Sequence, residues 1–163
     1  MAWLTPATIE TASDAVKDLI REHDININKS QKVATLLLNA VVYDSVEKNG
    51  LRMYAELQRL LSKRKGDLLE YVISRENNSD VCLRYFTKCL AEQGIDFETT
   101  QFDDEEKLII EYGTAIARDF HNIPDDLKKR LRGAFTDEQI AVITGMAVVI
   151  NADNMFETIM DVH

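Results

Sequence analysis

Two cysteines, Cys82 and Cys89, carry the side chains best suited to nucleophilic or redox chemistry in this chain of 163 residues. Cys82 follows Ser79 by one helical turn, in the segment NNSDVC at positions 77–82. A thiol in the first turn of a helix lies near the positive end of the helix dipole, which favours the nucleophilic thiolate. Asp80 in the same turn and burial of the thiol would both oppose this effect. On position alone, the pattern favours a small buried hydrophobic side chain at Cys82, and a reactive thiol is the alternative.

Cys89 is seven residues from Cys82 in the sequence, on nearly the same face of one expected helix. The two residues are then about 10 Å apart along the helix axis, at about 1.5 Å per residue. A disulfide requires Cα atoms within about 7 Å, so these thiols cannot bridge while the helix is intact. We therefore expect Cys89 in the core. A resolving thiol would have to come from local unfolding, from another subunit or from a small molecule.

Ser79 and Asp67 are the polar side chains that could assist Cys82. Ser79 precedes a helical pattern and is predicted to be its N-cap, which would also place a hydroxyl beside the thiol. Asp67 is predicted at or near the first turn of the preceding helix, where a carboxylate offsets the dipole. As a general base, Asp67 would need a hydrogen-bond path to Cys82.

Helices are expected to position these groups. Apolar residues recur with helical spacing and no alternating strand pattern is present, so we predict an all-α fold of about seven helices in one domain over residues 1–163. A first helix is expected from Pro6 to His23, with Pro6 in its first turn, a second up to Val46 and a third over 51–63, followed by a basic break. Later helices are expected over 80–92, 103–119, 124–132 and 136–162, two of which begin with the capping-box pairs Asp103/Glu106 and Thr136/Gln139.

Charge and composition narrow the function. The net charge of −9 argues against nucleic acid and anionic membranes as partners. The apolar stretch 140–150 is shorter than the roughly 20 residues of a membrane span, and the N-terminus carries no basic, apolar signal pattern. We therefore expect a cytoplasmic protein with reduced cysteines. No metal or cofactor is predicted, because no metal motif joins the cysteines to the three histidines, His23, His121 and His163.

The corner at 72–86 resembles the signature of the AhpD-like, or carboxymuconolactone decarboxylase, family. That signature commonly reads V-S-R-x-N-N-C-x-x-C-x-x-x-H. The segment VISRENN at 72–78 matches the part that precedes the first Cys. Ser79 then stands at the first Cys, Cys82 at the second and Phe86 at the His. Asp67 stands at the acidic residue upstream, and 104–160 resembles the C-terminal helices, so the resemblance covers 53–160.

The resemblance implies a function. In the family's thiol peroxidases the second Cys attacks the peroxide, the first resolves the sulfenic acid, and the Glu and His relay protons. By this resemblance, Cys82 is the attacking thiol, and Ser79 supplies a hydroxyl but cannot form a disulfide. Asp67 supplies a carboxylate on a shorter side chain, and Phe86 cannot transfer a proton. The implied protein is a divergent alkylhydroperoxidase-like enzyme that reduces peroxides through one thiol, with an external thiol as reductant. The family's lactone decarboxylases rely on the His that Phe86 replaces.

A non-catalytic family member is the alternative, an oligomer that binds a small apolar ligand or a protein partner. The family forms trimers or hexamers, and the broad apolar faces at 33–46 and 140–150 suit burial against a second copy, so a homo-oligomer is expected. Asn151, Asp153 and Asn154 interrupt the last apolar run. They are predicted to make hydrogen bonds between helices.

Overall fold

A computed structural model describes residues 4–162, and the regular elements of this part of the chain are all helices. The predicted all-α class is confirmed. The elements are α1 (Asp14–His23), α2 (Gln31–Leu36), α3 (Ala40–Tyr43), the π-helical η1 (Asp44–Lys48), α4 (Asn49–Leu60), α5 (Lys63–Glu76), α6 (Asp80–Glu92), α7 (Asp104–Asp119), α8 (Asp125–Ala134) and α9 (Asp137–Ile159).

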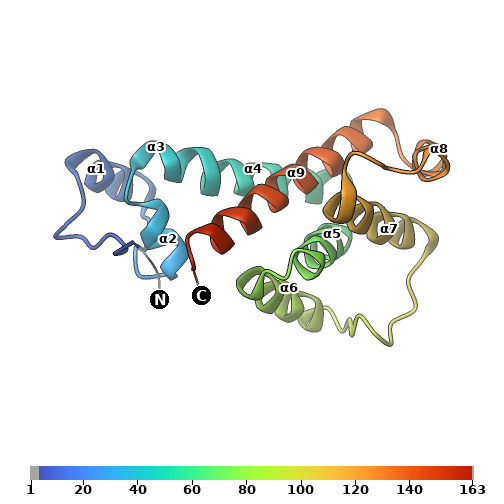
Figure 1. Cartoon of the computed structure of the whole chain (residues 1–163), viewed down its shortest axis with the longest axis horizontal. Coiled ribbons are helices and arrows are strands. Elements are labelled where there is room, and N and C mark those ends of the chain that lie inside the picture. The colour runs from blue at the N-terminus through green and yellow to red at the C-terminus, as the bar shows by residue number, and fades with distance from the viewer. Residues whose placement is uncertain (1–3, 163) are drawn as a thin grey trace.

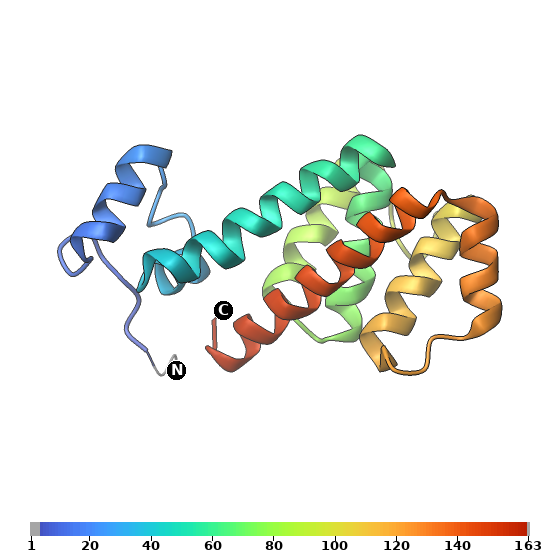
Figure 2. The same ribbon diagram turned by 90° about the horizontal axis from the view of Figure 1, so that it is seen from above.

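The two longest helical rods, η1–α4 and α9, run side by side along the molecule (Figures 1 and 2). They are antiparallel, because the side chain of Gln139 at the start of α9 donates to the carbonyl of Leu60 at the end of α4. α5 packs against α4, α6, α7 and α9 and forms the centre of the larger half of the molecule. α2 lies at the opposite end, beside the last turns of α9, and α1 lies farther out (Figure 1).

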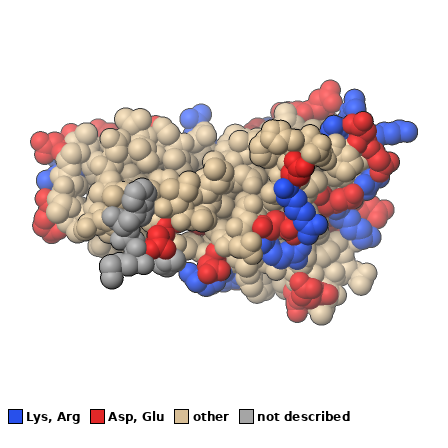
Figure 3. Space-filling model, in the orientation of Figure 1, with Lys and Arg blue, Asp and Glu red and all other residues tan. Residues whose placement is uncertain are grey.

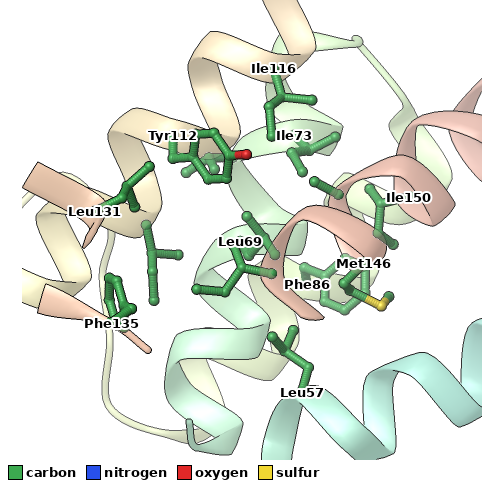
Figure 4. Packing of buried hydrophobic residues seen from close by; sticks show 14 of the residues in the cluster. Leu57, Leu69, Ile73, Phe86, Tyr112, Ile116, Leu131, Phe135, Met146 and Ile150 are labelled. Carbon is green, nitrogen blue, oxygen red and sulfur yellow. The ribbon is translucent and has the colours of Figure 1, made fainter. Parts of the chain in front are cut away.

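The main hydrophobic core lies between α5, α7 and α9, with α6 and α8 at its edges (Figure 4). Leu69 and Ile73 from α5 and Ile150 from α9 are among the fully or almost fully buried residues. Phe86 joins this core, as predicted. α7 packs tightly against α5 at Gly113, where an added Cβ would lie 2.8 Å from Cγ2 of Val72.

A second hydrophobic cluster fixes the N-terminal segment. Val16, Val33, Leu36 and Leu37 are fully or almost fully buried there, and Phe156 of α9 packs against the cluster. The N-terminal segment is therefore attached to the C-terminal half of α9, which brings α2 close to the corner between α5 and α6.

The first two predicted helices were wrong in extent. α1 begins at Asp14, because Ser13 caps it by accepting from the backbone N–H of Val16, so Pro6 is not in its first turn. The second helix ends at Leu36 and does not run unbroken to Val46. Asn39 then accepts from the N–H groups of the next turn and starts α3, since a polar side chain that caps competes with continuing the helix.

The break between α4 and α5 covers only 61–62 and not the whole predicted basic segment 62–66. Ser62 caps α5 by accepting from the N–H of Lys65, so the basic residues form its first turn. Asp67 consequently lies more than one turn inside α5, beyond its predicted place near the helix start. The boundaries of α6 and α7 were predicted correctly, and both capping boxes are present.

α9 is long and apolar enough to cross a membrane by length and composition alone. Core helices meet the same criterion, and α9 packs along α4 and α5 with Ile143, Met146 and Ala147 buried. This helix is therefore weak evidence for a membrane span.

Candidate functional site

Cys82 lies in the first turn of α6 and faces the last turns of α9. Its Sγ donates a hydrogen bond to Oε1 of Glu157 at 3.3 Å and lies 4.0 Å from Oδ2 of Asp153. The residue is only 7% exposed. The thiol therefore has a carboxylate as its immediate hydrogen-bond acceptor.

Ser79 holds the other oxygen of the same carboxylate. Its hydroxyl donates to Oε2 of Glu157 at 2.7 Å, and both residues are buried. Ser79 occupies the N-cap position of α6, but its side chain makes no capping hydrogen bond. The predicted capping role of the hydroxyl was therefore wrong, because the stronger, charged acceptor lies within reach.

Lys32 supplies the positive charge of the site. Its ammonium forms an ion pair with Asp153 and lies 3.6 Å from carboxylate oxygens of both Glu157 and Glu47. These three carboxylates hold the pKa of Lys32 above its ordinary value, although burial acts in the opposite direction. Lys32 stays charged, and it ties α2 of the N-terminal segment to α9.

Burial raises the pKa of the Cys82 thiol far above its ordinary value, and the charges of Glu157 and Asp153 raise it further. Lys32 lowers this pKa but does not offset the other causes. The helix dipole that favours a thiolate is therefore outweighed in the folded protein. Cys82 is a neutral thiol whose proton points at a base, so its reaction with an electrophile requires that the proton be removed during attack.

Asp67 belongs to a different cluster from Cys82. It is fully buried and accepts hydrogen bonds from Tyr54, Lys63 and Gln93. No hydrogen bond joins Asp67 to Cys82 in the described part of the chain, so the structure brings together Cys82 and Ser79 but not Asp67. With three donors around it, this carboxylate forms a structural network between α4, α5 and α6.

Glu70 lies between the two clusters. It is 2% exposed, and burial raises its pKa well above the ordinary value, with further increases from Asp67 and Asp153. Lys32 and Lys63 lower this pKa, but by less. Burial therefore favours the neutral, protonated form of this carboxyl group.

Cys89 is buried and free, as is Cys82. Its pKa is also raised, by burial first and by the charge of Asp67 second. It lies beside Asp67 and Tyr85, away from the carboxylates that surround Cys82. The core position predicted for Cys89 is confirmed.

A metal could use Cys82, Asp153 and Glu157, whose ligand atoms all lie within 4.8 Å of one another. The Lys32 ammonium contacts both carboxylates of this trio and already balances part of their charge. A divalent cation would have to displace it, so the donor set fits an internal ion pair better than a metal.

A pocket of about 180 Å³ adjoins the site. Ser79 and Glu157 line it, and the hydrogen bond between these two residues lies at one wall of the pocket. The other lining residues are Asn78, Asp80, Val81, Thr158, Asp161 and Val162. Cys82 is not among the lining residues, so a small molecule in this pocket would contact Ser79 and Glu157 rather than the thiol.

Sequence reasoning missed Glu157 and Lys32. Glu157 continues the spacing of the buried face of α9, three residues after the buried Asn154 and seven after Ile150. This register could have indicated a buried carboxylate. Lys32 carries no such local signal, because its partner Asp153 is 121 residues away in the chain.

The predicted interhelix hydrogen bonds of α9 are present. Asn151 accepts from Asn77 at 2.9 Å, and Asn154 donates to Ser74 at 3.4 Å. Both bonds connect α9 to the corner at the end of α5, so they help to hold Glu157 opposite Cys82.

Comparisons with known proteins support the fold. No family model and no curated protein matches the chain. The structure is similar to the crystal structure of an "uncharacterized peroxidase-related protein" from Silicibacter sp. TM1040, with a TM-score of 0.73 over 98% of this chain and 94% of that chain. The two sequences are 16% identical, so the likeness shows only that the helices of the two proteins share one arrangement.

Proposed function

We propose that this protein is a thiol redox enzyme that reduces small peroxides through Cys82, with Glu157 as its general base. One observation carries the proposal: the buried thiol donates its hydrogen bond to a carboxylate whose second oxygen is held by Ser79. This arrangement combines a nucleophile, a base and a group that orients the base, the combination that activates nucleophiles in enzymes generally.

In the first step, the Cys82 sulfur attacks the terminal oxygen of a hydroperoxide, the one that carries the hydrogen. The sulfur–oxygen bond forms as the oxygen–oxygen bond breaks, the sulfur is oxidised to a sulfenic acid and the peroxide is reduced to an alcohol. Glu157 takes the thiol proton during attack and returns it to the leaving alkoxide, so that its own charge is restored. Because the thiol pKa is raised, this coupled proton transfer replaces a preformed thiolate.

Ser79 and Lys32 assist this step. The Ser79 hydroxyl fixes the orientation of the Glu157 carboxylate, and the Lys32 charge, 3.6 Å from Oε1, favours negative charge developing nearby. These residues take the place that the resemblance assigned to Asp67. The role proposed for Asp67 is structural.

In the second half of the cycle, an external thiol restores Cys82. Ser79 stands where a resolving cysteine would be, and Cys89 lies on the same helix two turns away, so neither can form a disulfide with Cys82. The proposal keeps the expected cytoplasmic location, where small thiols are abundant. The fold of a protein described as peroxidase-related also supports it.

The test is hydroperoxide consumption together with intact-mass analysis. A gain of one oxygen on Cys82, and turnover in the presence of a small thiol, are expected from the wild-type chain and from Cys89→Ser. Cys82→Ser should abolish both. Glu157→Gln should keep the thiol but slow oxidation by about 100-fold, the usual contribution of a general base. Unchanged peroxide consumption by Cys82→Ser would disprove the proposal.

A non-catalytic binding protein is the second candidate, and the deep burial and neutral state of Cys82 favour it. A thiol that gains no oxygen under a large excess of hydroperoxide would support this alternative. In that case a ligand of the pocket, or a protein partner, would be sought by native mass spectrometry.

The homo-oligomer, expected as a trimer or hexamer, is also a proposal. Val148, Met155 and Ile159 are each about 60% exposed and share one face of α9. Figure 3 shows that the surface along the middle of the molecule carries few charged side chains. Light scattering after size exclusion tests this: Met155→Glu should lower the measured mass if this face is covered by a second copy.

A further inference from the structure

Cys82 and Lys32 are neighbours in one buried cluster, although they belong to α6 and α2. Oε1 of Glu157 lies 3.3 Å from the Cys82 sulfur and 3.6 Å from the Lys32 nitrogen. Oδ2 of Asp153 lies 4.0 Å from the same sulfur and forms an ion pair with the same nitrogen. The thiol and the ammonium are therefore adjacent to the same two oxygen atoms, and the Lys32 charge lowers the pKa of the thiol.

Oxidised Cys82 would have few other partners. The residue is 7% exposed, and it lines neither the pocket at Ser79 nor the pocket between α7, α8 and α9. Ser79 has no sulfur, and Cys89 cannot reach Cys82 along one intact helix. A sulfenic acid on Cys82 would therefore meet the nitrogen of Lys32 before it meets a thiol from solution.

We propose that Lys32 resolves the sulfenic acid of Cys82 by forming a covalent sulfur–nitrogen bond, a sulfenamide. Sulfenic acids condense with nitrogen as well as with thiols. The bond would join α2 to α6 and would perform the task of a resolving cysteine. It would also protect the sulfur from further oxidation to a sulfinic acid. This inference rests on the proposed peroxidase function and names the group that receives its oxidised sulfur.

The step balances with Glu157 as the base. The Lys32 ammonium transfers one proton to Oε1 of Glu157 as its nitrogen attacks the Cys82 sulfur. The sulfur–oxygen bond breaks, and the sulfenic hydroxyl leaves as water with a second proton from the nitrogen. One N–H remains in the sulfenamide. The hydroperoxide that formed the sulfenic acid is the only oxidant that the sequence of steps consumes.

The carboxylates of the cluster have two opposing effects on Lys32. They hold its pKa above the ordinary value, so the side chain is charged before the reaction. They also place a proton acceptor beside the nitrogen, because Oε1 of Glu157 is 3.6 Å away. Attack and proton transfer are therefore coupled, as they are for the thiol, and the bond should form more slowly than with a neutral amine.

A small external thiol completes the cycle in two exchanges. It attacks the Cys82 sulfur, and the nitrogen leaves with the proton of that thiol and the proton held by Glu157, so that Lys32 becomes an ammonium again. A second thiol attacks the outer sulfur of the mixed disulfide. This exchange releases the Cys82 thiol and a small symmetrical disulfide.

Intact mass tests the bond in Cys89→Ser protein, whose single thiol is Cys82. After treatment with hydrogen peroxide, the expected product is a monomer that has lost two hydrogens and that a small thiol returns to its starting mass. A chain with one cysteine cannot lose two hydrogens by forming an internal disulfide. A tryptic digest at neutral pH should link residues 30–48 to residues 76–84, because trypsin does not cleave after a modified Lys32. Protein that gains oxygen but never loses two hydrogens would overturn the inference and leave the proposed function standing.

Lys32→Arg is the matched variant, because a guanidinium keeps the positive charge but stays protonated and is no nucleophile. In the Cys89→Ser background it should gain one oxygen and then a second, without the loss of two hydrogens. Lys29→Arg is the control, since Lys29 is three residues away and its side chain is 66% exposed. It should form the bond as the parent protein does. A two-hydrogen loss that persists in Lys32→Arg would also overturn the inference.

Hypochlorous acid separates the two proposals if the chain reacts with no hydroperoxide. One equivalent converts a thiol to a sulfenyl chloride, which an amine attacks with loss of chloride, so the same linked peptides should result. Their formation in a chain that consumes no peroxide would disprove the proposed function and establish the bond between Cys82 and Lys32. Their absence with both oxidants would overturn the inference.

Discussion

Cys82 and Glu157 lie 75 residues apart in the chain, yet the thiol donates a 3.3 Å hydrogen bond to the carboxylate. The acceptor is on the last helix, and the donor is in the first turn of α6. This pairing favours the neutral thiol and provides a carboxylate that can accept its proton. It also predicts that two properties of Cys82 respond in opposite directions when the carboxylate is neutralised.

Glu157→Gln should make Cys82 easier to ionise but slower with peroxide. The charge of Glu157 helps to raise the thiol pKa, so its removal lowers that pKa and shifts the alkylation profile of Cys82 towards neutral pH. Gln cannot accept the proton, so oxidation by a hydroperoxide should slow. The two pH–rate profiles check this in Cys89→Ser protein, and a variant that slows in both reactions would indicate a merely structural role for Glu157.

Lys32→Met should destabilise the fold by about 3 kcal/mol, because it leaves neighbouring carboxylates without their cation. The control is Lys128→Met, which removes only an exposed pair with Asp125. Urea unfolding at pH 7 measures the difference between the two.

The stabilisation by Lys32 should also depend on pH. The folded pKa of Lys32 is raised above its unfolded value, so the contribution is complete below the ordinary lysine pKa of about 10.4 and is lost as pH rises through the folded pKa. The difference between the wild type and Lys32→Met should therefore shrink only in strongly alkaline solution. A constant difference across that range would contradict the assignment.

Glu70→Gln should stabilise the protein at neutral pH. The folded pKa of Glu70 is raised, chiefly by burial, so the folded state holds a proton that the unfolded state releases above pH about 4.3. From this pH up to the folded pKa of Glu70, the free energy of unfolding falls as pH rises. Gln does not titrate, so the variant does not lose this stability. Urea midpoints of the variant and the wild type should converge near pH 4 and separate above it.

The matched comparison for Glu70 is Glu111→Gln. Arg130 lowers the pKa of Glu111, so its contribution has the opposite sign: it is present above the ordinary pKa and is lost on acidification. Glu111 is partly exposed, so the effect should be small. If both variants moved the midpoint in the same direction at neutral pH, the explanation for Glu70 would fail.

Gly113→Ala should destabilise the packing of α5 against α7 by about 1–3 kcal/mol. The new Cβ would lie 2.8 Å from Val72 and 3.0 Å from Leu69, both in the packed core. Gly133→Ala is the control, because that helical position has no atom within 4 Å of an added Cβ. It should be neutral or stabilise by up to about 1 kcal/mol, through better helix propensity. Thermal unfolding distinguishes the two variants.

The sequence by itself determined the helical class, the bounds of α6 and α7, the capping boxes at Asp103 and Thr136, and the core positions of Phe86 and Cys89. Helical spacing and caps are local signals, which act over three or four residues and can be read directly. The early helices were mispredicted because three polar residues cap helices at places that the wider pattern did not mark. Ser13 and Asn39 start helices inside segments whose apolar spacing is continuous. Ser62 starts a helix inside a segment whose basic charge suggested a break.

Only the tertiary structure decided which groups surround Cys82. Ser79 was expected to cap α6 and Asp67 to assist the thiol, yet Ser79 bonds to Glu157 and Asp67 is held in a separate cluster. Lys32 and Glu157 come from opposite ends of the chain, and they meet because Phe156 packs into the N-terminal hydrophobic cluster. Long-range packing of this kind leaves no local pattern in the sequence, and the chemistry of the thiol depends on it.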